Sequence, residues 1–292
     1  MNIKVIRNYL NKTQNEFAEM INVSFATINR WENGHDSPSK IAQSKIYDIC
    51  KQYDVPAFEM IIKDINEIVD NIDIDPNRII LYHGSKSEIA GSIKPISRKL
   101  CDFGQGFYMG TDPRQPLTLI SDYKDCTFYI VSINLNDLSV LEIPNNIDWA
   151  MFVAFNRGKL QEVIDTSFYE KYQKMGENKD IIIGSIADDR MFFVLDNFFS
   201  SYISDEALIR SLSALKLGRQ YVAITEKACD SIKIEKEIKL SYLDKLILKD
   251  EAKLNRKKGV TYAKSICRNY RKEGTFFDDI LDSVKEENDG RI

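Results

Sequence analysis

The sequence predicts a multi-domain protein in which a small all-α domain precedes a larger mixed α+β domain. The chain has 292 residues, which is enough for two modest domains. Apolar residues recur at helical spacing up to about residue 72. Beyond Asp75-Pro76, where the proline disfavours a helix, glycine turns alternate with strand-like apolar runs. We therefore divide the chain into residues 1–75, residues 76–240, and a basic helical extension with an acidic tail, residues 241–292.

Composition narrows the class of protein. The net charge of −4 gives no global preference for polyanions, so any contact with nucleic acid must be local. The first residues lack the apolar core of a signal peptide and no run is long enough to span a membrane, so we expect a cytoplasmic protein without a membrane partner. Five cysteines without a CxxC pair, and only two histidines, predict neither a disulfide framework nor a metal site.

The first domain contains two short helices joined by a tight turn. Thr13 and Glu16 fit a capping box that should start one helix, and Ser24 should cap a second helix that ends at Asn33-Gly34. The stretches TQNEFAEMINVS and ATINRWENG resemble the helix-turn-helix of the phage-repressor and xenobiotic-response-element family. A helical stripe from Val55 to Ile72 then leads toward the second domain.

This resemblance implies that the second helix of the pair enters the major groove of DNA. The DNA-binding residues that it predicts are Gln14, Phe25, Thr27, Asn29 and Arg30. A helical module that docks a protein is the alternative. The local charge keeps that alternative open, because residues 1–53 hold seven basic and five acidic side chains, a net charge of only +2.

The second domain begins with a candidate nucleotide site. A β-rich run from Ile79 delivers His83-Gly84-Ser85, and a turn at Gly104-Gln105-Gly106 delivers Phe107-Tyr108. A histidine at a strand end can donate to a ribose hydroxyl, and a small glycine exposes its own backbone groups. An aromatic ring after a glycine turn can stack on a planar heterocycle.

These residues resemble the front half of the NAD site in ADP-ribosyltransferases of the diphtheria-toxin and poly(ADP-ribose) polymerase class. The stretches DFGQGFYMGTD, NIDWAMFVAFNR, KDIIIGSIADDR and GRQYVAITEKA are also similar to an uncharacterised bacterial domain family whose members look like distant relatives of that class. The similarity covers roughly Ile79 to Ile234. It implies an ADP-ribosyltransferase-like domain with split, mostly antiparallel sheets, and NAD as a substrate without a metal.

The resemblance also implies roles for single residues. His83 would hold the adenosine ribose, Gly84 would pair with the nicotinamide carboxamide, and Tyr108 would stack on the nicotinamide ring. Leu119 stands near a second aromatic position of the class, and Gln220 stands where the class has a glutamate that stabilises the developing cation. The predicted catalytic residues are His83, Tyr108 and Gln220, and the predicted NAD contacts are His83, Gly84, Ser85, Gly106, Tyr108, Leu119, Asp188 and Asp189.

Two charged stretches admit two interpretations each. Asp188-Asp189 follows a buried-strand pattern and could hold a ribose hydroxyl or an acceptor, but such a pair also fits a solvated turn and cap. Residues 245–272 carry ten Lys or Arg and two acids, a net charge of +8. They fit either a helical face exposed to water or a contact with nucleic acid or an acidic partner.

The function that we expect is NAD-dependent mono-ADP-ribosylation of a macromolecular acceptor, either protein or nucleic acid. Fusion to a repressor-like module suggests a toxin or phage-defence effector, with an antitoxin as a further partner. The alternative is a transcription regulator whose second domain senses NAD or ADP-ribose without turnover, and Gln220 and Leu119 favour it. An inert structural domain is the third interpretation.

Overall fold

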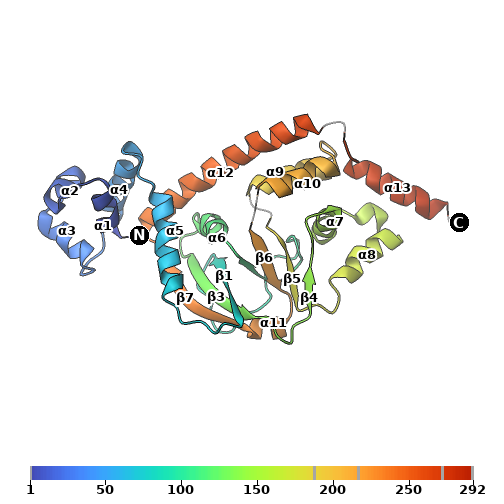
Figure 1. The fold of residues 1–292 in the computed structure, drawn as a ribbon, viewed down its shortest axis with the longest axis horizontal. Helices are drawn as coiled ribbons and strands as arrows, with labels where there is room; N and C mark the ends of the chain where they lie inside the picture. Colours follow the sequence, from blue (N-terminus) through green and yellow to red (C-terminus); the bar gives the residue numbers. More distant parts are fainter. Residues whose placement is uncertain (1, 187–188, 216–217, 271–272, 291–292) are drawn as a thin grey trace.

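The structure is a computed structural model that describes residues 2–186, 189–215, 218–270 and 273–290. A helical N-terminal domain lies at one end of a β-sheet domain (Figure 1). The long helix α12 (Tyr242–Asn269) extends from the N-terminal domain along the sheet domain.

Five helices form the N-terminal domain: α1 (Ile3–Tyr9), α2 (Gln14–Ile21), α3 (Phe25–Glu32), α4 (Lys40–Gln52) and α5 (Ala57–Asp70). The predicted capping box at the start of α2 is confirmed, since the Thr13 side chain accepts from the Glu16 amide and the Glu16 carboxylate accepts from the Thr13 amide. Ser24 caps α3 by accepting from the Thr27 amide at 3.1 Å. These local caps fix where the two helices of the predicted pair, α2 and α3, begin.

Seven strands form the sheet of the second domain: β1 (Arg78–Ser85), β2 (Phe107–Gly110), β3 (Thr127–Asn134), β4 (Val140–Glu142), β5 (Ile181–Ser185), β6 (Arg219–Ala223) and β7 (Ile232–Lys239). Their order is β4-β5-β6-β2-β1-β3-β7, and every neighbouring pair except β4–β5 is antiparallel. The expected mostly antiparallel pairing is therefore confirmed. The expected split into separate sheets is not observed in the described chain, because the Tyr82–Gly110 pair joins β1 to β2.

The remaining helices surround this sheet: α6 (Arg114–Ile120), α7 (Ile147–Asn156), α8 (Ser167–Met175), α9 (Asp189–Phe199), α10 (Asp205–Leu215), α11 (Glu226–Asp230) and α13 (Phe277–Asp289), with a 3-10 turn η1 (Gln161–Val163). Helix α12 packs against α4 and α5 near its start and against α9 and α10 further along. One helix thus contacts both domains.

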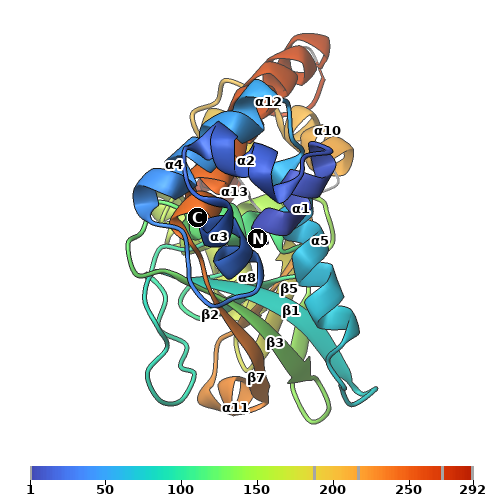
Figure 2. The same ribbon diagram turned by 90° about the vertical axis from the view of Figure 1, so that its left-hand side faces the viewer.

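The two domains share an apolar core. Helix α5 runs beside the sheet in both views (Figure 2) and buries Ile61 and Ile65 in a cluster that also contains Phe128 of β3 and Leu248 of α12. Burying these side chains is worth roughly 1.5–3 kcal/mol each. The chain turn near residue 75 therefore separates two sequence segments that pack as one body.

Candidate functional site

A cavity of about 440 Å³ opens where the sheet, helix α6 and helix α12 meet. It is lined by residues from distant segments of the second domain, among them His83, Gly84, Tyr108, Leu119 and Gln220. Its size lies within the range of cavities that hold small molecules and cofactors. Four of the predicted NAD contacts and the predicted catalytic residue Gln220 thus come together in one place.

His83 lies at the junction of β1 and β2, where these strands share one registered pair in the described chain. Its Nδ1 lies 2.7 Å from the Tyr108 carbonyl oxygen, and its ring stacks on Phe107 at 4.1 Å between centroids. Burial lowers the pKa of His83 to about 4, although the contact with the Tyr108 carbonyl opposes this shift. The imidazole is neutral at physiological pH.

The tautomer of His83 follows from this contact. A carbonyl oxygen only accepts, so Nδ1 must carry the proton and donate it, which leaves Nε2 with a lone pair. The sequence suggested a histidine that donates to a ribose hydroxyl. The structure corrects this role, because the ring nitrogen left over can accept a hydroxyl hydrogen but has none to donate.

The glycine turn before β2 fixes the ring of Tyr108. Gly104 has φ +77°, a conformation that favours glycine, and its carbonyl accepts from the Tyr108 hydroxyl at 2.7 Å. The same hydroxyl accepts from the Phe103 amide at 3.0 Å. Burial raises the pKa of Tyr108, so the hydroxyl stays protonated. The Tyr108 hydroxyl is therefore engaged by the backbone, and the ring is the part of this side chain that can contact a ligand in the cavity.

Gly84 is required by packing as well as by the cavity that it lines. A Cβ atom at Gly84 would lie 2.6 Å from the Pro116 carbonyl oxygen and 2.7 Å from the Ile120 Cγ2 atom, both on α6. This close approach brings α6 over the end of β1. On α6, Leu119 is 60% exposed and lines the cavity.

Gln220 is the buried polar group of the cavity, with 7% of the residue exposed. It lies on β6 opposite Gly110 of β2 and Gly184 of β5. Its Nε2 donates to the Ser185 carbonyl at 3.0 Å. The amide is thus oriented by the backbone of β5, and its oxygen is the atom that can accept from a ligand.

The other predicted contacts have different positions. Ser85 ends β1, and Gly106 packs on β6, where a Cβ would lie 2.5 Å from the Val222 Cγ1 atom; neither lines the cavity. Asp188 lies outside the described residues. Asp189 begins α9, and its side chain also lies outside the described part.

The structure adds cavity residues that the sequence patterns did not indicate. Phe58 and Glu59 come from α5, and Glu251, Ala252 and Asn255 come from α12. Asp102 and Arg157 also line the cavity and form an ion pair of 2.6 Å. Asp102 lies in the turn before Gly104, and Arg157 directly follows α7. Periodicity could place the residues of α5 and α12 on helices, but nothing local in the sequence relates any of these cavity residues to His83 or Gln220.

The predicted DNA-binding residues lie on α2 and α3. Phe25 is 48% exposed, and Asn29 and Arg30 are exposed on the same helix, while Thr27 is half-buried beside its cap Ser24. The Asn29 Oδ1 atom accepts from Asn33 Nδ2 at 2.5 Å, which leaves the Asn29 amide hydrogens to donate outward. This face presents polar and aromatic groups from one helix.

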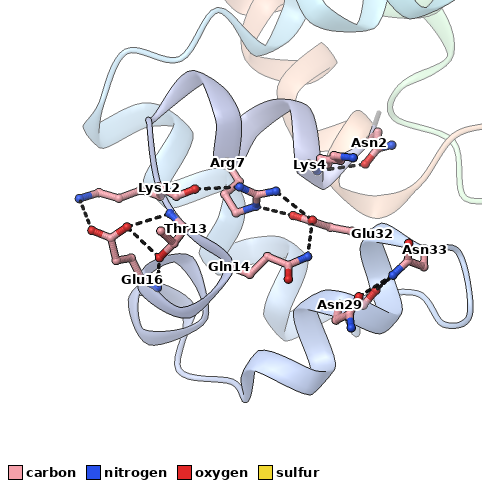
Figure 3. Close-up of polar contacts among 10 residues, drawn as sticks. All are labelled: Asn2, Lys4, Arg7, Lys12, Thr13, Gln14, Glu16, Asn29, Glu32 and Asn33. Atoms are coloured by element: carbon pink, nitrogen blue, oxygen red, sulfur yellow. Dashed lines mark hydrogen bonds and ion pairs between the residues drawn. The ribbon is translucent and has the colours of Figure 1, made fainter.

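Gln14 is part of a buried polar cluster rather than a free side chain (Figure 3). Its Nε2 donates to Glu32 at 2.7 Å, and Arg7 donates to the two oxygens of Glu32 at 2.6 and 3.0 Å. Burial opposes ionisation of Glu32, but the hydrogen bonds from Arg7 and Gln14 outweigh it and lower the pKa of Glu32. This cluster connects α1, the start of α2 and the end of α3.

Within the described residues, no group of three or more His, Cys, Asp or Glu side chains could hold a metal ion. No described helix combines the length and apolarity needed to cross a membrane. The five cysteines form no disulfide in the described chain.

Comparison with known families matches two separate segments of the chain. Residues 3–60 match the helix-turn-helix family, so the N-terminal domain is of a DNA-binding type. Residues 79–234, more than half of the chain, match the family described as "Protein of unknown function (DUF3990)", and the chain belongs to that family. No curated protein and no solved structure matches the chain.

Proposed function

We propose that the second domain is an ADP-ribosyltransferase that uses NAD as its substrate and acts on a macromolecular acceptor. One observation carries the proposal: His83, Gly84, Tyr108, Leu119 and Gln220, which come from four separate segments, line the same cavity. The DNA-binding type of the N-terminal domain fits an effector that also acts on its own gene.

The chemistry of these side chains suits a dinucleotide. The lone pair on His83 Nε2 can accept a hydrogen bond from a ribose hydroxyl, and the Tyr108 ring can stack on a flat heterocycle. The Gln220 amide oxygen can accept a hydrogen bond from a second ribose hydroxyl. Arg98, which also lines the cavity, can attract the pyrophosphate.

The proposed reaction breaks the bond between the ribose C1 atom and the nicotinamide nitrogen, and nicotinamide leaves with the electron pair. A nucleophile of the acceptor forms the new bond to the same carbon and gives up its proton. Gln220 orients the ribose through a neutral amide, so it adds no negative charge to oppose the positive charge that develops. We therefore expect slow release of nicotinamide in the absence of the acceptor.

The test is NAD binding by calorimetry and nicotinamide release, measured on the full chain. His83→Ala and Tyr108→Ala should each weaken NAD binding about tenfold or more, because each removes a contact worth about 1–2 kcal/mol. Tyr202→Ala is the matched control, since Tyr202 is 77% exposed and does not line the cavity. Folded variants that bind NAD as the parent does would reject the assignment.

The second candidate function is a transcription regulator that binds NAD or ADP-ribose without turnover. The neutral Gln220 and the non-aromatic Leu119 favour it, as does the wall that α5 of the DNA-binding domain contributes to the cavity. NAD binding without nicotinamide release, in the presence of cell extract as a source of acceptor, would support this function over the transferase.

A further inference from the structure

The cavity is completed by a helix that lies outside the matched family segment. Helix α12 begins at Tyr242, after residue 234, and contributes Glu251, Ala252 and Asn255 to the wall. Lys249 pairs with Asp122 at 3.1 Å, and Lys245 donates to the Tyr123 carbonyl at 3.0 Å. These contacts hold α12 against the end of α6, the helix that carries Leu119.

Asp250, the residue before Glu251, connects the same turn of α12 to the N-terminal domain. The Asp250 carboxylate accepts from the Tyr47 hydroxyl and pairs with Lys51 at 2.9 Å, both on α4. This turn of α12 thus contacts α4 on one side and the segment after α6 on the other, and Glu251 lines the cavity wall from it.

The charges that line the cavity are mostly paired. Arg114 lies 3.3 Å from Glu59 and 3.5 Å from Asp112, and Arg157 lies 2.6 Å from Asp102. Two lining charges, Glu251 and Arg98, have no ion-pair or hydrogen-bond partner for their side chains among the residues that the structure describes. Glu251 is also half-buried, so water screens it less than a fully exposed carboxylate.

We infer that Glu251 makes the cavity selective for the oxidised over the reduced dinucleotide. This inference rests on the proposed function. The two redox forms have the same adenosine, riboses and phosphates, but the oxidised nicotinamide ring carries a positive charge and the reduced ring is neutral. Glu251 lines the same cavity as Leu119, from a helix that packs against α6, and an unpaired carboxylate there would attract the charged nicotinamide ring and not the neutral one.

Arg98 provides an internal comparison. Its guanidinium would attract the phosphates, which are the same in both redox forms. Removing the charge of Arg98 should therefore weaken binding of both redox forms by the same factor. Removing the charge of Glu251 should weaken binding of the oxidised form alone. The two substitutions thus separate general affinity from redox discrimination.

The experiment measures the Kd of the full chain for NAD and for NADH, at low temperature and over a time in which nicotinamide release is negligible. It uses the parent, Glu251→Gln, Arg98→Gln and Glu286→Gln. Glu286 is exposed on α13 and does not line the cavity, so its variant controls for the loss of one negative charge. Thermal unfolding confirms that all four proteins fold.

We expect Glu251→Gln to raise the Kd for NAD by roughly threefold to tenfold and to leave the Kd for NADH unchanged, because a partly screened charge pair contributes about that much. Arg98→Gln should raise both, and Glu286→Gln should change neither. A parent that binds both dinucleotides, with an unchanged ratio in Glu251→Gln, would overturn the role of Glu251 alone. A parent that binds neither would overturn the proposed function and this inference with it.

Discussion

The N-terminal domain and the cavity use charged side chains in opposite ways. In the N-terminal domain, Glu32 accepts from Arg7 and Gln14, and this cluster has its charges satisfied inside the protein. In the cavity, Glu251 and Arg98 have no partner among the described residues. Charge that is satisfied internally fixes a structure, whereas unpaired charge in a concave site is available to a ligand.

The strongest test of this contrast is Glu32→Ala. The side chains of Glu32 and Arg7 are 3% and 12% exposed, so the substitution leaves a buried guanidinium without its partner. We expect the free energy of unfolding to fall by ~3–5 kcal/mol. Urea unfolding measures this loss, and Glu19→Ala, which removes an exposed carboxylate on α2, is the control. Equal losses in the two variants would show that the cluster does not support the fold.

The pH dependence of the same cluster has a defined sign. The pKa of Glu32 is lower in the folded protein than its ordinary value of 4.5. The folded state therefore binds the proton less readily than the unfolded state, and the stabilisation is present above pH 4.5 and is lost as the pH falls through the folded pKa. Glu32→Gln should remove this part of the acid sensitivity. A parent and variant with the same slope in acid would contradict the pKa shift.

The contrast also shows what the sequence could predict. Thr13 with Glu16, and Ser24 with Thr27, are neighbours in the chain, so capping rules placed α2 and α3 correctly. The resemblance to ADP-ribosyltransferases, carried by short local motifs, points to His83, Tyr108 and Gln220, and all three line one cavity in the structure.

The unpredicted features are those set by long-range packing. The tautomer of His83 depends on a carbonyl in β2, and the need for Gly84 depends on the approach of Pro116 on α6. Gln14 is predicted as a DNA contact, but α3 brings Glu32 beside it, and the Gln14 amide donates to that carboxylate. Glu251 lies in a basic segment whose pattern fits a charged helical face or a contact with an acidic partner, and neither interpretation relates it to the cavity. Partners that are far apart in sequence leave no periodic signal.

A smaller effect is expected from Gln220→Glu, which adds a charge to the cavity. The Gln220 amide donates to the Ser185 carbonyl, and an ionised glutamate there would face this carbonyl with no hydrogen to donate. Protonated glutamate can still donate, so the pKa of the new carboxyl should be raised by burial and by this contact. Its stabilisation is present below the unfolded pKa and is lost as the pH rises, and we expect a loss of about 1–3 kcal/mol near neutral pH.

Urea unfolding of Gln220→Glu and Gln220→Ala at acid and at neutral pH measures this effect. The alanine variant should lose similar stability at both pH values, because it has no group to titrate. A glutamate variant that is as stable as the parent at neutral pH would mean that the Ser185 contact does not constrain this position.

The smallest effects on folding stability are expected at the exposed face of α3 that carries the predicted DNA contacts, because the fold does not depend on these side chains. Asn29 is oriented by Asn33, with its amide hydrogens left to donate to an acceptor on a base edge. Arg30 is 63% exposed and pairs weakly with Asp36 at 3.6 Å, so it can turn to a phosphate. Asn29→Ala should therefore reduce discrimination between DNA sequences by about 1–3 kcal/mol, and Arg30→Ala should weaken all sequences alike.

The measurement is a titration of the full chain against a duplex selected from a random pool and against an unrelated duplex, at several salt concentrations. The full chain is needed because α5 shares its core with the sheet domain, and truncation near residue 75 would expose Ile61 and Ile65. Arg30→Ala should also reduce the slope of log K against log salt by about one, since one phosphate contact is lost. Asn33→Ala should reproduce part of the Asn29→Ala effect, because it removes the group that orients the Asn29 amide. If Asn29→Ala and Arg30→Ala both weakened the two duplexes equally, α3 would contact only the DNA backbone, and base readout would have to come from another element.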